Sequence, residues 1–229
     1  MAYKHGIDVS EAQGQIDWVK VKASGKVDFA IIRCSLGWTD GNIALRRDSR
    51  FLENVKGCEA NGIPYGIYWY SYCLKPENAK REAEYVLRVI EGTKPTMGVW
   101  LDIEANAQIS LGKDAITKIA VDECAVLKAA GYNVGVYSYL YWLEHYMDMS
   151  QLSEYPVWLA QVDVEKPSYK GDIAMWQYSW TGNVEGINGD VDLDLSYTAD
   201  PVIKSPILVE IDDIIDRLLK LRKEIEKNG

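Results

Sequence analysis

The chain has 229 residues, of which 48% are hydrophobic, so it is long enough to bury one large core with an appendage. Its formal net charge is −9, from 25 basic and 34 acidic residues, and the acidic residues are spread along the chain. No nucleic-acid partner is expected, because binding phosphates requires basic patches. No membrane insertion is expected either, since no segment approaches the roughly 20 consecutive apolar residues that span a bilayer.

Short apolar runs recur along the chain and predict eight strands. The predicted strands cover residues 5–10, 29–35, 65–72, 97–104, 133–139, 156–162, 173–179 and 190–196. Helical patterns separate the early strands, at residues 16–24, 48–61, 76–91 and 114–130, and Gly131 follows the last of these as a helix C-cap. Strands that alternate with helices predict a parallel sheet.

The pattern changes after the fifth predicted strand. Residues 141–147 allow only about two turns of helix, and the two later gaps between strands contain Pro, Gly, Asn and Ser without a helical stripe. We therefore predict an α/β fold in residues 1–198, with an eight-stranded barrel, about five full helices and an irregular final third.

Residues 199–229 form a separate region, which is predicted to be a linker and an amphipathic helix over 207–227. Its apolar positions repeat every three or four residues, and acidic side chains gather early and basic ones late, which complements the helix dipole. Three roles are open for this helix: docking against the barrel, self-association, or a stalk to a further wall-binding module.

Acidic residues stand near the ends of several predicted strands. They are Asp8 in the first strand, Asp102 and Glu104 at the end of the fourth, and Asp190, Asp192 and Asp194 in the eighth. Residues two apart on a strand point to the same face, about 7 Å apart, so each of these strands is expected to present its acids to one side. Paired carboxylates beside an apolar wall disfavour each other's ionisation, which raises the pKa of one of them. Such a pair suits glycosidic bond cleavage, which requires a proton donor and a nearby negative charge.

Active sites of barrels of this kind lie at the C-terminal ends of the strands. Further residues on the predicted strands are candidates to face the same opening, namely Arg33, Tyr68, Tyr70, Tyr137, Trp158 and Gln177. Packing in the barrel interior is an equally good explanation for about half of these positions, because alternate strand residues must fill it.

No metal site and no cofactor are expected. The chain has two histidines and no HExxH motif or Cys/His cluster, and it has no G-x-S-x-G nucleophile elbow. Its four cysteines, Cys34, Cys58, Cys73 and Cys124, show no CxxC spacing and are expected to be buried thiols, with a disulfide as the alternative.

Several motifs together resemble the glycoside hydrolase family 25 lysozymes, in the order and spacing of that family over about residues 3–198. The motifs are Gly6-Ile-Asp-Val-Ser10, Gln13-Gly-Gln-Ile-Asp-Trp18, Phe29-Ala-Ile-Ile-Arg33, Gly62-Ile-Pro-Tyr-Gly-Ile-Tyr68, Leu101-Asp-Ile-Glu104, Val157-Trp-Leu-Ala160, Met175-Trp-Gln-Tyr-Ser179 and Val191-Asp-Leu193. The resemblance implies a flattened TIM-like barrel of five strand–helix units and three further strands.

The same resemblance implies an N-acetylmuramidase that cleaves the β-1,4 bond between N-acetylmuramic acid and N-acetylglucosamine in bacterial peptidoglycan. By position, Glu104 would be the acid/base, Asp102 the adjacent carboxylate, and Asp8 and Asp192 supporting acids. The chain departs from the family pattern at Ala12, where an aromatic residue or His is frequent, and at Asp194, where Asn is commoner.

Two mechanisms are open for Asp102, which could attack the sugar directly or orient the substrate's own acetamido group as the nucleophile; we favour the second. Two other functions are weighed against the muramidase. A chitinase-like glycosidase would have a D-x-x-D-x-D-x-E run that this chain lacks, and a non-catalytic glycan-binding protein would have no need of the intact set of acids. The expected place of action is the bacterial cell wall, outside the cell or after release from the cytoplasm at lysis, because the N-terminus does not read as a signal peptide.

Overall fold

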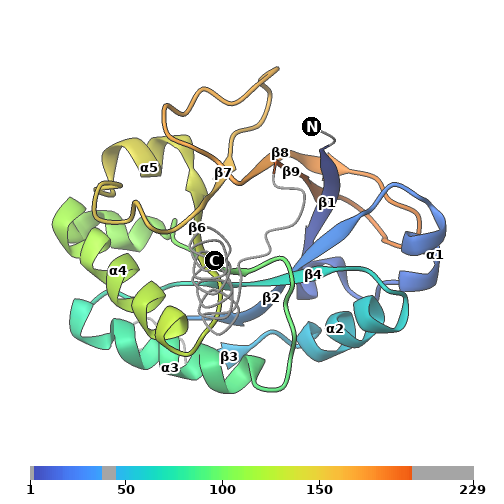
Figure 1. Ribbon diagram of the computed structural model, residues 1–229, viewed down its shortest axis with the longest axis horizontal. Helices are drawn as coiled ribbons and strands as arrows, with labels where there is room; N and C mark the ends of the chain where they lie inside the picture. Colours follow the sequence, from blue (N-terminus) through green and yellow to red (C-terminus); the bar gives the residue numbers. More distant parts are fainter. Residues whose placement is uncertain (1–2, 38–44, 198–229) are drawn as a thin grey trace, which may run out of the picture.

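The computed structural model describes residues 3–37 and 45–197, which form a closed barrel with helices around it (Figure 1). The eight strands of the barrel are β1 (Lys4–Val9), β2 (Phe29–Leu36), β4 (Tyr65–Tyr70), β5 (Val99–Asp102), β6 (Val134–Tyr139), β7 (Val157–Ala160), β8 (Met175–Gly182) and β9 (Val191–Ser196). The eight-stranded barrel is as predicted. A further strand, β3 (Arg46–Arg47), pairs antiparallel with β2 and was not predicted, because two residues are too few to show a pattern.

Strand direction explains where the last strand places its side chains. Six neighbouring pairs in the ring, from β1–β2 round to β7–β8, are parallel. By contrast, β9 is antiparallel to both β8 and β1 and closes the barrel between them. The first residues of β9 therefore lie beside the last residues of β1, with Asp192 opposite Asp8.

Helices follow the first five parallel strands of the barrel. They are α1 (Trp18–Ala23), α2 (Phe51–Ala60), α3 (Ala79–Ile90), α4 (Lys113–Ala129) and α5 (Leu140–His145), and short 3-10 turns occur at Glu11–Gln13 (η1), Pro76–Asn78 (η2) and Asn106–Leu111 (η3). The helix α3 buries Ala79, Glu82, Ala83, Val86 and Ile90, and α4 ends just before Gly131, whose φ of 88° favours glycine. Figure 1 shows α3 and α4 side by side on the outside of the barrel. The connections after β7 and β8 contain no helix, so the last three strands form the irregular third that the sequence predicted.

The buried residues form two clusters, one between barrel and helices and one inside the barrel. The inner cluster contains Phe29, Ile31, Tyr68, Met97, Trp100, Tyr137, Trp158, Ala160 and Met175. At Gly6 of β1, an added Cβ would lie 2.2 Å from the Phe29 ring, so only glycine lets β1 pass over this side chain.

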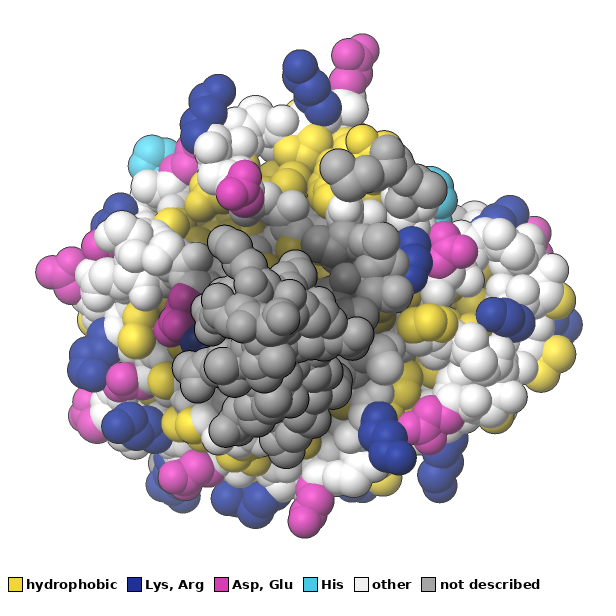
Figure 2. All heavy atoms as spheres, in the orientation of Figure 1, with side chains coloured by type: hydrophobic (Ala, Val, Ile, Leu, Met, Phe, Trp, Pro, Cys, Tyr) yellow, Lys and Arg dark blue, Asp and Glu magenta, His cyan; other side chains and the backbone are white. Residues whose placement is uncertain are grey.

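The cysteines behave as buried thiols. Cys34, Cys58 and Cys124 lie in β2, α2 and α4, and Cys73 lies just after β4; all are buried and none forms a disulfide. In the part of the chain that the structure describes, no helix combines the length and apolar character needed to cross a membrane. On the face in Figure 2, basic and acidic side chains are interspersed over the described surface. The predicted linker and helix over 199–229, including the segment 207–227 considered for self-association, lie outside the described residues.

Candidate active site

A cavity of about 260 Å³ lies where the parallel strands of the barrel end. Ten of the twelve acidic and strand residues named from the sequence line it: Asp8, Arg33, Tyr68, Tyr70, Asp102, Glu104, Tyr137, Trp158, Gln177 and Asp192. Ser10, Ala12 and Gln13 complete the lining. We call this site the acidic cavity.

The pairing of neighbouring strands brings these side chains to one level. Tyr70 pairs with Asp102, Asp102 with Tyr137, and Tyr137 with Trp158, so four consecutive barrel strands place one cavity residue each at the same height. Parallel strands in register point such residues to the same side of the sheet. The site is therefore built from rigid strand ends and not from long loops.

Asp102 and Glu104 form the centre of the acidic cavity. The strand β5 ends at Asp102, two residues earlier than the predicted strand, and Glu104 follows it as the chain leaves the barrel. Asp102 Oδ1 and Glu104 Oε2 are buried and accept no hydrogen bond within the described residues. Two buried, unsatisfied carboxylate oxygens are costly unless one of the groups carries a proton.

Burial raises the pKa of both carboxyl groups. The pKa of Glu104 rises to about 7, mainly through burial and also through the charge of Asp192. The pKa of Asp102 rises well above its usual range through burial and the charge of Glu104, while the guanidinium of Arg33 opposes this rise. Arg33 thus favours the charge on Asp102, while burial of both groups favours keeping a proton on the pair.

Asp8 and Asp192 are joined through Gln177. The Gln177 side-chain nitrogen donates to Asp8 Oδ2 at 2.8 Å and to Asp192 Oδ2 at 3.4 Å, and its oxygen accepts from the Tyr137 hydroxyl at 2.9 Å. Burial raises the pKa of Asp192 to about 6, and burial and the charges of Asp194 and Asp192 raise that of Asp8. One amide group therefore fixes the positions of two acids from neighbouring strands.

Trp158 occupies the floor of the acidic cavity. Its ring contacts Tyr137, Trp100 and Tyr68 with centroid separations of 4.5, 5.9 and 6.1 Å, in tilted and edge-on arrangements. Such aromatic contacts are worth about 0.5–1.5 kcal/mol each beyond the area they bury. The floor is consequently apolar and stiff, which keeps water away from one side of the carboxylates.

Arg33 is held by two acids that the sequence did not point to. Its Nε donates to Asp48 Oδ2 at 2.8 Å, and its Nη2 lies 3.4 Å from Glu11 Oε1. Glu11 also pairs with Arg46, which lowers the pKa of Glu11 to about 2. Asp48 lies 15 residues from Arg33 in a segment without any motif, so no local signal could have linked the two.

The predicted strand 190–196 requires two corrections. Asp190 does not line the cavity: it precedes β9 and is exposed, and its carbonyl oxygen accepts from the Gln13 side chain at 3.4 Å. Asp194 lies beneath the cavity and not at its opening; it is fully buried, and its Oδ1 accepts from Trp158 Nε1 at 2.9 Å. Burial raises the pKa of Asp194 to about 8.

Ser10 and Gln13 were quoted only as parts of a motif, yet both line the cavity. They form the capping box of η1: the Ser10 hydroxyl accepts from the Ala12 amide at 3.1 Å, and the Gln13 side chain accepts from the Ser10 amide at 2.9 Å. The Ser-x-x-Gln spacing is the sequence signal for this turn. The turn holds Ala12 against the opening, where it contributes only a methyl group.

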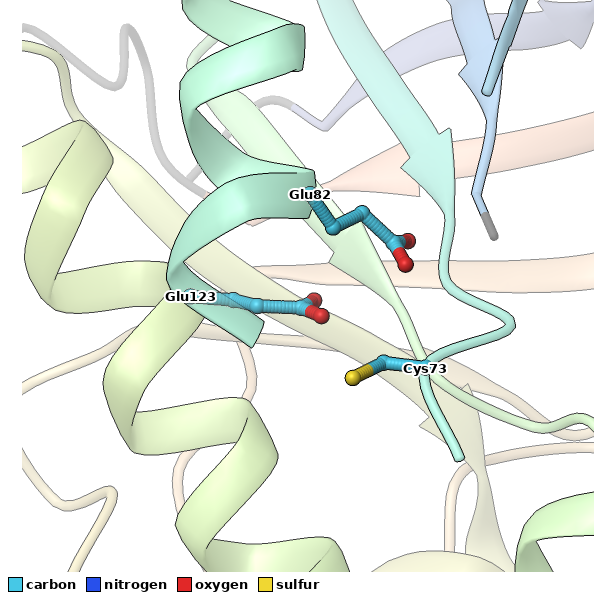
Figure 3. A group of neighbouring side chains, drawn as sticks. All are labelled: Cys73, Glu82 and Glu123. Atoms are coloured by element: carbon cyan, nitrogen blue, oxygen red, sulfur yellow. The ribbon is translucent and has the colours of Figure 1, made fainter. Parts of the chain in front are cut away.

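A second group of acids lies outside the acidic cavity, between the barrel and the helices (Figure 3). Glu82 of α3 and Glu123 of α4 project from neighbouring helices toward Cys73, and each of the three offers one possible metal-ligand atom within 4.8 Å of the others. Glu123 accepts from Ser71 Oγ at 3.0 Å and from Trp69 Nε1 at 3.3 Å. Burial, followed by the charge of Glu82, raises the pKa of Glu123 well above its usual range. The two helices therefore pack against the barrel through buried acidic side chains.

The acidic cavity as a whole can donate one proton and stabilise one positive charge. The pKa of Glu104 lies near neutrality, which suits a proton donor, and Asp102 is a second buried carboxyl group beside it. General acid catalysis is most effective when the pKa of the acid lies near the working pH. An acetal such as a glycosidic bond is cleaved by this combination of groups.

Comparison with known proteins gives an independent result. Residues 7–187 match the family model described as glycosyl hydrolases family 25. The chain is 30% identical over 189 residues to an autolytic lysozyme of Clostridium acetobutylicum, covering 82% of this chain and 54% of the relative. It is 29% identical to lysozyme M1 of Streptomyces globisporus, covering 82% of this chain and 65% of that protein. The chain thus spans about half to two thirds of the length of these two relatives.

Solved structures show the same relationship. The modular autolysin LytC from Streptococcus pneumoniae superposes with a TM-score of 0.71 at 29% identity, over 85% of this chain and 47% of that one. The bacterial lysozyme from Streptomyces coelicolor superposes with a TM-score of 0.69 at 26% identity, over 86% and 94% of the two chains. The matched residues include twelve of the thirteen residues that line the acidic cavity, all except Asp192, which lies in β9 beyond the match. The chain belongs to glycosyl hydrolase family 25.

Proposed function

We propose that this protein hydrolyses the glycan of bacterial peptidoglycan at the β-1,4 bond between N-acetylmuramic acid and N-acetylglucosamine, with Glu104 as the acid/base. The observation that carries the proposal is the buried Asp102–Glu104 pair in a cavity that also holds Asp8 and Asp192. Membership of the family adds support, as does the relative from Streptococcus pneumoniae, whose structure was solved with a synthetic peptidoglycan ligand.

In the first step, Glu104 transfers its proton to the glycosidic oxygen while the bond from that oxygen to the sugar C1 breaks. The acetamido oxygen of the same sugar forms a bond to C1 from the opposite face, and Asp102 accepts a hydrogen bond from the acetamido N–H and stabilises the positive charge. In the second step, the Glu104 carboxylate removes a proton from a water molecule, whose oxygen adds to C1 as the acetamido oxygen leaves. Acid–base help of this kind is worth roughly 10²–10⁴ in rate.

Asp8, Asp192 and Gln177 set the conditions for this reaction. The charge of Asp192 contributes to the raised pKa of Glu104, so that Glu104 still carries its proton near pH 7. Gln177 holds Asp8 and Asp192 at fixed positions beside the pair. Direct attack of Asp102 on C1 is the alternative route, and it also gives retention of configuration. Inversion at C1 would exclude both routes.

The experiment that tests the proposal is the clearing of a cell-wall suspension by wild type and by Glu104→Gln. The substitution keeps the shape of the side chain but removes the proton donor, so clearing should fall by at least about 100-fold. Near-normal clearing by Glu104→Gln would remove this residue from the mechanism. NMR analysis of the first product formed then reports whether the configuration at C1 is retained. The proposed place of action is accordingly the bacterial cell wall.

A further inference from the structure

Trp180 is a large aromatic side chain that is half exposed, at 53%, beside the acidic cavity. Its indole Nε1 donates to Gln177 Oε1 at 3.1 Å, so one edge of the ring lies in contact with a cavity residue. Gln177 is the residue whose amide nitrogen holds Asp8 and Asp192. Trp180 is therefore anchored to the wall of the cavity and not free on the surface.

Irregular pairing between β8 and β9 turns Trp180 toward the cavity. Gln177 pairs with Asp194, Ser179 with Leu193 and Gly182 with Val191, with a register shift in each of the two intervals. In a regular strand, residues three apart point to opposite faces, so Gln177 and Trp180 would lie on different sides of the sheet. The extra residue of β8 places Trp180 and Thr181 together opposite Asp192, and the hydrogen bond to Gln177 places the Trp180 indole beside the cavity. Bulges of this kind are known to redirect side chains next to active sites.

We propose that Trp180 is a stacking platform for a pyranose ring of the glycan, next to the sugars that enter the acidic cavity. This inference rests on the proposed function and names one more contact of the same substrate. The C–H face of a pyranose is apolar and matches the flat face of an indole, whereas its hydroxyl groups need polar neighbours. Ser179 and Thr181 are the chain neighbours of Trp180 in β8, and each carries a hydroxyl group.

The anchoring bond favours this role for a physical reason. Because the indole N–H is already engaged with Gln177, the part of the ring that remains exposed offers its face rather than its donor. A side chain that is already held in place loses little conformational freedom when a ligand binds. The stacked sugar also removes apolar ring surface from water.

The test measures binding and turnover of soluble glycan strands of the wall, freed of peptide and of defined chain length. Three substitutions separate the ring from its hydrogen bond. Trp180→Phe keeps an aromatic face without the N–H, Trp180→Gln keeps a donor without the face, and Trp180→Ala removes both. Tyr3→Ala is the matched control, because Tyr3 is 56% exposed and lies next to β1 at the opposite end of the barrel, in contact with Tyr197.

Binding is measured calorimetrically in the Glu104→Gln background, and KM and kcat are measured with Glu104 intact. Trp180→Gln and Trp180→Ala should raise Kd and KM about 3- to 10-fold, the size of one lost aromatic contact, with kcat within about twofold of wild type. Trp180→Phe should stay within about threefold of wild type, and Tyr3→Ala should match wild type. The effect should vanish for strands too short to reach Trp180.

Two results would overturn the inference while leaving the proposed function intact. If wild type cleaves the strands and Trp180→Gln binds them as tightly as wild type, the indole face is not used. If Trp180→Phe loses as much affinity as Trp180→Ala, the hydrogen bond to Gln177 matters and not the ring. If wild type neither binds nor cleaves the strands, the proposed function fails, and this inference fails with it.

Discussion

Asp8 and Asp192 lie directly opposite each other in the antiparallel ladder between β1 and β9, and the Gln177 side-chain nitrogen donates to both, at 2.8 and 3.4 Å. Like charges that face each other across a ladder destabilise a sheet unless something compensates. Here the neutral amide of Gln177, from the neighbouring strand β8, donates to both carboxyl groups. Burial raises the pKa of Asp192, and the hydrogen bond between Asp192 and Asp8 partly offsets this rise. The closure of the barrel and the assembly of the acidic cavity therefore depend on the same three side chains.

Replacing Gln177 tests this arrangement. Gln177→Met keeps the length of the side chain but donates no hydrogen bond, so Asp8 and Asp192 lose their common partner. We expect kcat to fall by about 10- to 100-fold, because misplaced catalytic groups cost about this much, while the far-UV circular dichroism spectrum stays unchanged. Gln151→Met, at an exposed position away from the cavity lining, is the control and should keep wild-type kcat. Unchanged kcat in Gln177→Met would show that the bridge has no role in catalysis.

The charge of Asp192 should be visible in the pH profile. Glu104 acts as an acid only while it is protonated, so activity is lost as the pH rises through its pKa of about 7. Asp192→Asn removes a negative charge that raises this pKa. The alkaline limb of log(kcat/KM) against pH should therefore move to lower pH, whatever happens to the maximal rate. An alkaline limb that stays in place would mean that Asp192 does not act on Glu104 electrostatically.

Replacing Arg33 should change both the acidic limb of the pH–activity profile and the free energy of unfolding. Its guanidinium opposes the rise in the pKa of Asp102, so Arg33→Met should raise that pKa and move the acid limb of the profile to higher pH. The same change leaves the buried Asp48 carboxylate without its ionic partner, and we expect a loss of about 3 kcal/mol in the free energy of unfolding measured with urea.

A surface ion pair provides the comparison for Arg33. Arg50→Met breaks the bridge to Glu53, whose side chain is 44% exposed, and should cost less than about 1 kcal/mol. Equal losses for the two variants would contradict the structural role given to the Arg33–Asp48 pair.

The buried acid Glu123 should make stability fall at high pH. Its pKa in the folded protein lies above the unfolded value, so the folded state holds its proton more tightly. The contribution of Glu123 to the free energy of unfolding is complete below its unfolded pKa of about 4.3, and it is lost progressively as the pH rises above that value. Glu123→Gln should flatten this decline in urea unfolding curves measured from pH 5 to about 9, whereas the exposed Glu165→Gln should leave it unchanged. A decline of equal slope in Glu123→Gln would assign the effect to other groups.

The sequence located the residues of the acidic cavity because they obey simple local rules. Asp8, Arg33 and Asp102 lie at or near the ends of parallel strands, where alternation and strand direction together say which side chains meet. The rules failed where the chain departs from them. The alternation of side chains along residues 190–196 does not show in which direction this strand runs. The prediction therefore placed Asp190 on the cavity side and Asp194 at the cavity opening.

Two other features could not be predicted for similar reasons. The position of Trp180 depends on register shifts between β8 and β9, which alter the alternation rule for a few residues and leave no clear mark in the sequence. The acid Asp48, which holds Arg33, comes from a segment that is close only after folding. Long-range contacts of this kind depend on how the barrel closes and not on the residues next to them.

Mass analysis of peptidoglycan digested by the purified protein, with Glu104→Gln treated in parallel, tests directly whether this protein is a muramidase that uses Glu104. We expect wild type to release fragments with N-acetylmuramic acid at the reducing end, and Glu104→Gln, folded as judged by circular dichroism, to release almost none. Fragments that end in N-acetylglucosamine, or equal release by the two proteins, would contradict this expectation.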